Sequence, residues 1–534
     1  MSWWEHLLFE KPDWMFTWGD AYGYENYWGH LLAILVLIVY GFCIFMIFCY
    51  SLLQLSLAVQ YRKHKHNRDT SQPVKTADDW PVVTIQLPIF NERYVAERII
   101  EVVSKQDYPK EKLQIQVLDD STDETTTLIH DKVIEVKNTT GLDISHIHRV
   151  NRSGYKAGAL DAAMDKVKGE FIAIFDVDFI PETDFLKKTV PLFKDEKIGL
   201  VQTRWGHINK NYSLLTELQA FGLNGHFAME QVGRSSAGHF INFNGTGGVW
   251  RKKCITSAGG WSHDTLTEDL DLSYRAQMKG WKFKYLEEVV APAELPVTIS
   301  ALKTQQHRWM KGGAQCFKKL AKNIITQKEM PFKTKIHGLM HLFNSSVFIF
   351  IFLLGILSIP VIHIKNSFTD LNFYIQLGGV FFASTILLMI YYWQSFRDKK
   401  GVLLIDLGRF VARFIQFLIV SMGLSLNNAV AVIEGYLGIQ SSFVRTPKFN
   451  ITKNEAVTQN KYLKKKLSPL TLIEGLLFIV FTFTCIQSVL LFDFSMLLLH
   501  LFLALGFGYV FTKSITEYLS TQKQEKLNLV PKKA

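Results

Sequence analysis

The sequence predicts an α/β domain with a mostly parallel sheet, inserted between transmembrane helices. Long apolar runs with few charges lie near the start and in the last third of the 534-residue chain, although 20% of all residues are charged. Between these runs, short β-branched segments alternate with helical patterns, which is typical of a parallel sheet covered on both faces. Global disorder is excluded because the chain can bury ample apolar surface. The apolar runs also exclude a purely soluble secreted protein.

The net charge indicates which partners the protein could bind, and the cysteines indicate whether disulfides or a zinc site are expected. The formal net charge of +11 favours nucleic acid, an anionic membrane face or a phosphorylated substrate. Nucleic acid is not expected, because the excess positive charge lies mainly beside the apolar runs. None of the five cysteines belongs to a Cys-x-x-Cys pair, so the sequence predicts neither a disulfide framework nor a zinc site.

The first apolar run, residues 31–59, predicts a transmembrane helix. It has no charged residue and is longer than the roughly 20 residues that cross a bilayer. A basic linker, residues 60–79, follows it, and no small-residue cleavage site marks it as a signal peptide. Residues 1–30 carry one lysine and five acidic residues. Because basic loops stay in the cytoplasm, residues 1–30 are predicted to be extracytoplasmic and residues 80–328 to form a cytoplasmic domain.

Polar residues follow three apolar strands of this domain, in the sequences LPIFNE, LDDSTD and DVD. Ligands bind at the carboxyl ends of strands in such sheets. Asp119 and Asp120 end one strand, and capping of the next helix does not explain two acids in a row. Asp176 and Asp178 leave the same face of an extended strand and suit Mg²⁺ or Mn²⁺, which also contact substrate phosphates. Taken alone, Asp-x-Asp is more often a turn.

Three later motifs carry further chemistry. In NRSGYKAGAL, Lys156 opens a helix, where backbone N–H groups and a lysine make a pyrophosphate cradle. In TED, Asp269 lies in the first turn of a helix, where the dipole is expected to lower its pKa, and Thr267 is expected to cap that helix. In QQHRW, Arg308 offers a fork for phosphate and Trp309 a flat face for a sugar ring. The alternative for the last pair is an interfacial tryptophan with a snorkelling arginine.

Residues 329–513 predict a C-terminal membrane region, followed by a basic cytoplasmic tail, residues 514–534. A cytoplasmic loop, residues 436–468, lies between basic stretches. The segment 403–435 carries several charges and must cross twice or not at all, so an in-plane or re-entrant helix is expected, with an ordinary sixth span as the alternative. The predicted spans are residues 339–364, 373–393, 470–492 and 494–512. Candidates for a polar product path, each also explained by helix packing, are Asn344, Gln416, Asn427 and Asn428.

Taken in order, LPIFNE, LDD, Asp-x-Asp, TED and Gln-x-x-Arg-Trp resemble the processive members of the family 2 glycosyltransferases. The stretch from FNGTGGVWR to QQHRW looks closest to cellulose-synthase-like mannan and xyloglucan-backbone synthases and their bacterial relatives. Ser121 stands where bacterial cellulose synthases have glycine, and no cyclic-dinucleotide-binding domain is visible. FVRTPK, residues 443–448, is similar to their cytoplasmic gating loop, with Arg445 in place of valine.

This resemblance implies a GT-A (Rossmann-like, nucleotide-sugar-binding) cytoplasmic domain, a Mg²⁺ or Mn²⁺ cofactor and inversion at the anomeric carbon. The implied catalytic residues are Asp269, as general base, and Glu268. The implied cation ligands are Asp176 and Asp178. The implied acceptor-binding residues are Trp309, Gly245 and Thr246, and those of the gating-like loop are Phe443, Thr446 and Lys448. The implied nucleotide-sugar-binding residues are Pro88, Asn91, Glu92, Asp119, Asp120, Lys156, Asp176, Gln305 and Arg308.

The expected function is that of a membrane-bound β-glycosyltransferase that uses GDP-mannose or UDP-glucose to elongate a β-linked polysaccharide and couples elongation to export. Two alternatives remain open: a transferase that glycosylates ceramide, diacylglycerol or a polyprenyl phosphate, and a catalytically inactive scaffold. The expected location is the bacterial inner membrane, as a multi-pass protein with a cytoplasmic catalytic domain. The expected partners are the donor, a glycan or lipid acceptor, membrane lipids and polysaccharide-export proteins.

Overall fold

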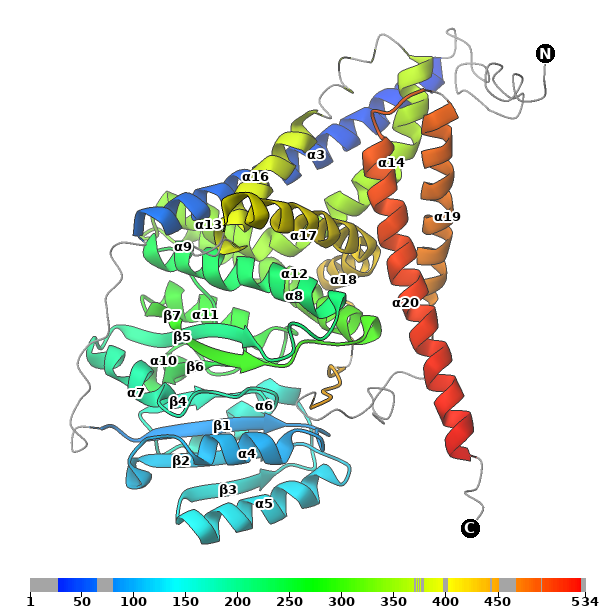
Figure 1. Ribbon diagram of the computed structural model, residues 1–534. Helices are drawn as coiled ribbons and strands as arrows, with labels where there is room; N and C mark the ends of the chain where they lie inside the picture. Colours follow the sequence, from blue (N-terminus) through cyan, green and yellow to red (C-terminus); the bar gives the residue numbers. More distant parts are fainter. Residues whose placement is uncertain are drawn as a thin grey trace.

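The computed structural model describes residues 27–64, 80–368, 371, 373, 375, 379–396, 402–441, 444–450, 467–490 and 492–529. Figure 1 shows a sheet domain in its lower half, with long apolar helices above it and to its right. Phe443 lies outside the described residues, as do residues 65–79 of the predicted linker, most of the predicted N-terminal segment and about half of the 436–468 loop.

The sheet has seven strands in the order β3-β2-β1-β4-β6-β5-β7. Only β6 runs against its neighbours, because it pairs antiparallel with both β4 and β5. The prediction of a mostly parallel sheet is confirmed, and β6 makes it a mixed sheet. The strands are β1 (Val83–Ile89), β2 (Leu113–Asp119), β3 (Asp143–His148), β4 (Phe171–Ile174), β5 (Ile198–His207), β6 (Gly248–Arg251) and β7 (Lys282–Ala293).

Both faces of the sheet are buried. In β4, Phe171 and Ala173 join one apolar cluster, whereas Ile172 and Ile174 join another. Because neighbouring side chains of a strand point to opposite faces, each face must have its own covering layer. The helices of this domain are α4 (Ala96–Ser104), α5 (Thr125–Thr140), α6 (Tyr155–Ala162), α7 (Phe185–Thr189), α8 (Leu214–Asn224), α9 (Gln231–Ser236), α10 (Lys252–Ser257), α11 (Glu268–Met278) and α12 (Ile299–Thr326).

Four stretches of helix among the described residues are long and apolar enough to cross a membrane: Gly29–Lys63, Phe332–Ser367, Pro469–Leu490 and Leu497–Lys523. They overlap four of the five predicted spans. The fifth, residues 373–393, is described only in part and contains most of α16. The helices of this region are α3 (Tyr27–His64), α13 (Phe332–Phe343), α14 (Val347–Ser367), α16 (Gly379–Phe396), α19 (Pro469–Leu490) and α20 (Leu497–Leu529).

The segment that was expected to lie in the membrane plane forms two helices, α17 (Leu403–Gly423) and α18 (Ser425–Leu437). Figure 1 shows α17 lying across α20 instead of beside it. Leu403, Leu404 and Ile405 of α17 are exposed, whereas Arg413 on the same helix pairs with Glu217 of α8. Apolar side chains facing outward and a charge facing the sheet domain are consistent with a helix that lies in the interface.

Helices α17 and α20 touch through two glycines. A Cβ on Gly423 would lie 2.2 Å from the carbonyl oxygen of Gly506, and a Cβ on Gly506 would lie 2.3 Å from that of Ile419. No side chain fits at this crossing, because backbone atoms cannot move aside as a side chain can.

We therefore expect Gly423→Ala to lower the free energy of unfolding by about 1–3 kcal/mol. Gly408, on the same helix, has nothing within 4 Å of its Cβ position. Gly408→Ala should be neutral or stabilise the protein by up to about 1 kcal/mol, because alanine favours the helix. Thermal unfolding of both variants in detergent measures the difference. Equal midpoints would contradict the close crossing.

Candidate functional site

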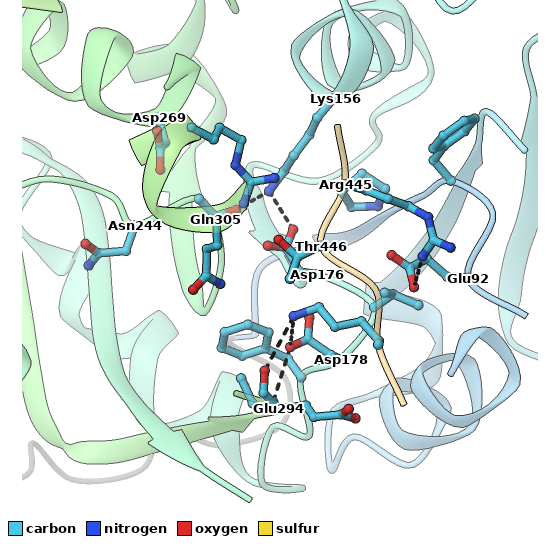
Figure 2. A pocket seen from close by; sticks show the side chains of 18 of the residues that line it. Glu92, Lys156, Asp176, Asp178, Asn244, Asp269, Glu294, Gln305, Arg445 and Thr446 are labelled. Carbon is cyan, nitrogen blue, oxygen red and sulfur yellow. Dashed lines mark hydrogen bonds and ion pairs between the residues drawn. The ribbon is translucent and has the colours of Figure 1, made fainter. Parts of the chain in front are cut away.

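A cavity of about 180 Å³ lies at the carboxyl ends of the parallel strands, where the polar residues were predicted to meet. Figure 2 shows it from close by, with Asp269 and Asn244 at one end and Glu92 and Arg445 at the other. Fourteen predicted site residues line it: Pro88, Glu92, Asp120, Lys156, Asp176, Asp178, Gly245, Glu268, Asp269, Gln305, Arg308, Trp309, Thr446 and Lys448.

Asp176 pairs with the lysine that opens α6. Lys156 Nζ lies 2.5 Å from Asp176 Oδ1 and donates to the carbonyl oxygen of Gly245 at 2.7 Å. Burial acts to lower the pKa of Lys156, but Asp176, Glu268 and Asp269 outweigh burial and raise the pKa. The lysine therefore stays charged and holds a positive charge in the middle of the cavity.

Asp178 pairs with the segment 444–450, which enters the cavity from the C-terminal membrane region. Lys448 Nζ lies 2.7 Å from Asp178 Oδ2, and Arg445 Nη1 lies 2.7 Å from Glu92 Oε2. Figure 2 shows this segment running between Asp176 and Glu92. The gating-like loop predicted from FVRTPK thus reaches the site through Thr446 and Lys448.

Glu294, at the carboxyl end of β7, holds the same segment by its backbone. Its carboxylate accepts from the N–H of Phe449 at 2.7 Å and from the N–H of Asn450 at 3.0 Å. Burial raises the pKa of Glu294, and Lys448 opposes that rise. Burial also raises the pKa of Glu92 to about 7, against the opposing effect of Arg445.

Asp269 and Glu268 begin helix α11 at the other end of the cavity. Burial, and then the charge of Glu268, raise the pKa of Asp269 to about 7. The prediction that the helix dipole lowers this pKa is wrong, because burial and a neighbouring carboxylate outweigh the dipole. The expected cap is also wrong: the Thr267 side chain makes no capping bond, and its Oγ1 lies 3.4 Å from Cys316 Sγ. A carboxyl group with a pKa near 7 is suited to accept a proton at neutral pH.

Helix α12 supplies the residues of the Gln-x-x-Arg-Trp motif. Gln305, Arg308 and Trp309 all line the cavity and are partly exposed to it. Arg308 opposes the raised pKa of Asp269, so its positive charge lies near the carboxylate end of the site. The motif therefore combines a guanidinium group and an indole ring in one cavity with the acids.

Three predicted residues do not line the cavity. Thr246 lies behind it, where its Oγ1 accepts from the N–H of Asp176 at 2.9 Å. Asn91, with a φ of 52°, accepts from the N–H of Thr122 at 2.8 Å and shapes the loop after β1. Asp119 is fully buried within β2 and contacts two histidines of β3. The structure thus gives these residues supporting positions around the site.

Two groups of side chains have the chemistry to hold a metal ion. Asp176 and Asp178 offer carboxylate oxygens, the donors that Mg²⁺ and Mn²⁺ prefer, and each now faces a lysine ammonium in the position of a cation. Asp119 with His146 and His148 forms a second group, whose imidazole nitrogens lie 3.0 and 3.1 Å from Asp119 Oδ2. In that second group, a hydrogen bond between each histidine and Asp119 already explains why the three side chains lie together.

Several cavity residues were not predicted from the sequence. Arg152 stacks on Phe90, with its guanidinium carbon 3.3 Å from the ring centroid. Glu294 and Asn244 also line the cavity. Asn244 precedes the two predicted residues Gly245 and Thr246, so the FNGTGG sequence was the available signal for it. Arg152 likewise belongs to NRSGYKAGAL, and Glu294 lies in the stretch from FNGTGGVWR to QQHRW, so these sequences were the available signals for the two residues.

Comparison with known proteins identifies the domain. Residues 81–312 match the family model described as "Glycosyltransferase like family 2". Probable glucomannan 4-beta-mannosyltransferase 11 of Oryza sativa subsp. japonica is 46% identical over 262 residues, which cover 48% of this chain and 46% of that protein. Glucomannan 4-beta-mannosyltransferase 9 of Arabidopsis thaliana is 41% identical over 300 residues, covering 54% of this chain and 56% of that protein.

The chain thus spans about half the length of the curated relatives it matches. Among solved structures, the mannosyltransferase PcManGT from Pyrobaculum calidifontis, in complex with GDP-Man and Mn²⁺, is similar to 74% of this chain and 100% of its own, at 18% identity and a TM-score of 0.48. The family match over residues 81–312 and the curated relatives confirm the resemblance that the motifs indicated.

The pairing of Lys448 with Asp178 leads to a test by metal binding. We expect Lys448→Met to raise the affinity for Mn²⁺ about tenfold, or ~1.4 kcal/mol, because the ammonium no longer competes for the carboxylate. Electron paramagnetic resonance of free Mn²⁺ measures this affinity. Lys168→Met is the control, since Lys168 forms an exposed pair with Asp143. Equal affinities of the two variants would contradict the competition.

Proposed function

We propose that the protein is a membrane-bound inverting β-mannosyltransferase that moves mannose from GDP-mannose to the end of a growing β-1,4-linked glycan. One observation carries the proposal: a single cavity contains paired acids of the Asp-x-Asp type, an acid with a pKa near 7, and the Arg308–Trp309 pair. The names of the relatives, glucomannan 4-beta-mannosyltransferases, support mannose as the sugar and a β-1,4 linkage.

The charged residues of the cavity indicate where the donor would bind. Asp176 and Asp178 would hold Mg²⁺ or Mn²⁺, which supplies positive charge to the departing diphosphate when it is bound. Lys156 and Arg308 add donors for phosphate oxygens. The nucleoside would then extend toward Glu92, at the opposite end of the cavity from Asp269 (Figure 2), and toward Pro88 and Asp120, which also line the cavity.

The transfer step follows from the position of Asp269. A hydroxyl oxygen of the acceptor attacks the anomeric carbon of mannose, and its proton passes to the Asp269 carboxylate. The new C–O bond forms as the bond from the anomeric carbon to the phosphate oxygen breaks, and GDP leaves with that electron pair. In-line attack turns the α-linked donor into a β-glycoside. Trp309 orients the acceptor by stacking on its terminal sugar, which lowers the entropic part of the barrier.

The proposal includes a location in the bacterial inner membrane, with the catalytic domain in the cytoplasm. The basic residues that follow α3 favour this orientation. Export of the product across the spans, assisted by export proteins, belongs to the same proposal. Asn427 and Asn428, two candidates for a product path, are buried, and Asn427 donates to the carbonyl oxygen of Lys303 at 3.2 Å. These contacts support helix packing as the role of this pair.

The experiment offers radiolabelled GDP-mannose and UDP-glucose, in parallel, to membranes that contain the protein and Mn²⁺. We expect label from GDP-mannose in an insoluble product that β-mannanase digests. Label in the lipid phase would contradict the proposal and identify the protein as a lipid glycosyltransferase. Polymer labelled only from UDP-glucose would show that the transferred sugar is glucose and not mannose. Absence of label with both donors would contradict glycosyl transfer by this chain.

The raised pKa of Asp269 makes a pH-dependent prediction. Only the ionised carboxylate accepts a proton, so kcat/KM should fall about tenfold per pH unit below about pH 7. Asp269→Asn should retain donor binding and lose about 10²- to 10⁴-fold in transfer. Glu92 has a similar pKa, so Glu92→Gln is the control, and it should keep the acidic limb of the profile. Loss of the acidic limb in Glu92→Gln would show that the limb reports the ionisation of Glu92, which would contradict its assignment to Asp269.

A further inference from the structure

Asp119 is a fully buried acid, and no lysine or arginine pairs with it in the part of the chain that the structure describes. Its Oδ1 accepts from the backbone N–H of Ser121 at 2.8 Å, and its Oδ2 faces two imidazole nitrogens. Donors of this kind favour the ionised form of a carboxyl group. The next acid along the chain, Asp120, is paired with Arg149. Because buried charges in proteins are paired or bind metal ions, a cation is expected at Asp119.

Two histidines of β3 contact the same oxygen of Asp119. His146 Nε2 lies 3.0 Å from Asp119 Oδ2, and His148 Nδ1 lies 3.1 Å from it. Because the two histidines are two positions apart on a strand, their side chains leave the same face of the sheet. Figure 1 shows β3 at the edge of the sheet with α5 beside it. His130 of α5 has its ring centroid 5.9 Å from that of His146, so the group lies between the edge strand and this helix.

The carboxylate oxygen and the two nitrogens have the separations of ligands that share one ion. All three atoms lie within 4.8 Å of one another. In a tetrahedral zinc site with bonds of about 2.0–2.1 Å, neighbouring ligand atoms lie about 3.3 Å apart, close to the two distances from Asp119 Oδ2. The Ser121 N–H orients the carboxylate, as outer partners orient metal ligands. The His148 side chain is 36% exposed, so an ion can enter from solvent.

From this geometry we infer that Asp119, His146 and His148 bind a divalent transition-metal ion of the zinc kind. Hydrogen bonds from neutral imidazoles hold the group together without metal, but they supply no positive charge to the buried carboxylate, whereas the ion does. Two imidazoles and one carboxylate favour Zn²⁺ over Mg²⁺ or Mn²⁺, so the site is separate in place and in metal from the one that Asp176 and Asp178 would form. The expectation of no zinc site rested on the cysteines, and this site contains none.

The ion has a structural role, because it joins β2 to β3 directly behind the cavity. Each strand contributes a ligand and then, at the next position, a member of the pair that ends the strands: Asp119 precedes Asp120, and His148 precedes Arg149. Arg149 donates to both carboxylate oxygens of Asp120, at 2.6 and 2.8 Å, and its backbone N–H donates to the carbonyl oxygen of Asp119 at 2.9 Å. Since Asp120 lines the cavity, the ion stabilises the wall of the cavity from the opposite side of the sheet.

The test uses the full chain in detergent, freed of metal by a chelator, with Co²⁺ as a coloured substitute for Zn²⁺. Cobalt with four ligands that include imidazole absorbs visible light strongly, whereas cobalt held by carboxylates and water absorbs weakly. We expect the strong bands in the wild type, and we expect Zn²⁺ to abolish them. His148→Ala should weaken Co²⁺ binding about 100-fold or more, since loss of even an outer partner of a ligand costs about 10- to 100-fold. His263→Ala is the control, because His263 is exposed and lies outside the group.

Thermal unfolding gives a second readout. Zn²⁺ should raise the unfolding midpoint of the wild type and of His263→Ala but not that of His148→Ala, because an ion that binds only the folded state stabilises it. Equal bands in the wild type and His148→Ala would place the ion elsewhere and overturn the inference. A wild type with neither bands nor a shifted midpoint would also overturn it, and would leave hydrogen-bonded histidines without a metal. His148→Gln, which keeps a hydrogen-bond donor, should show the same loss if His148→Ala fails to fold.

Discussion

The acids at the strand ends are stable in a half-closed cavity because each one faces a positively charged or hydrogen-bonding side chain. Asp120 accepts two hydrogen bonds from Arg149, at 2.6 and 2.8 Å. Asp176 and Asp178 each face a lysine. An isolated buried carboxylate would be too costly to keep ionised, so the pairs are a condition for having this many acids in one place. A metal ion that bound with the substrate would therefore meet acids that are already held in place by positive charges of the protein.

Helix α12 connects this charged cavity to the membrane helices. At its start, Glu517 of α20 accepts from the N–H groups of Ile299 and Ser300, at 2.5 and 3.1 Å. Further along, Lys303 pairs with Glu474 of α19 and Lys311 with Glu434 of α18, both at 2.7 Å. Three membrane-region helices thus hold α12 at successive positions. Since α12 carries Gln305, Arg308 and Trp309, any shift of those helices would move these cavity residues relative to the sheet.

The fold could be predicted from the sequence to the extent that it depends on periodicity. Nearly continuous apolar strands indicated burial on both faces, and the structure confirms it. The direction of β6 could not be predicted, because a strand of four residues, GVWR, contains no pattern that indicates its direction in the sheet. The pKa of Asp269 was predicted in the wrong direction, since burial depends on what α11 packs against and not on its own sequence.

The candidate site could also be predicted only in part from the sequence. The motifs predicted which segments meet, but not which side chain of each segment faces the cavity. Asp119 belongs to β2 and sits opposite His148 of β3, whereas Asp120 follows the strand and lines the cavity. Neighbouring residues of an extended chain point to opposite sides, so two adjacent acids cannot share one role. The contact of Glu294 with the segment 444–450 was not predicted, because the two lie far apart in the sequence.

The contact between Lys448 and Asp178 joins residues that are 270 positions apart, and it links the cavity to the membrane region. A metal ion that bound at Asp178 Oδ2 would compete with the ammonium group of Lys448 for that oxygen. Lys448 moves with the segment 444–450, which Arg445, Asn450 and Glu294 also tie to the sheet domain. That segment lies between α18 and α19. Any displacement of Lys448 would therefore act on these ties, and on α18 and α19, which flank the segment in the sequence and both contact α12.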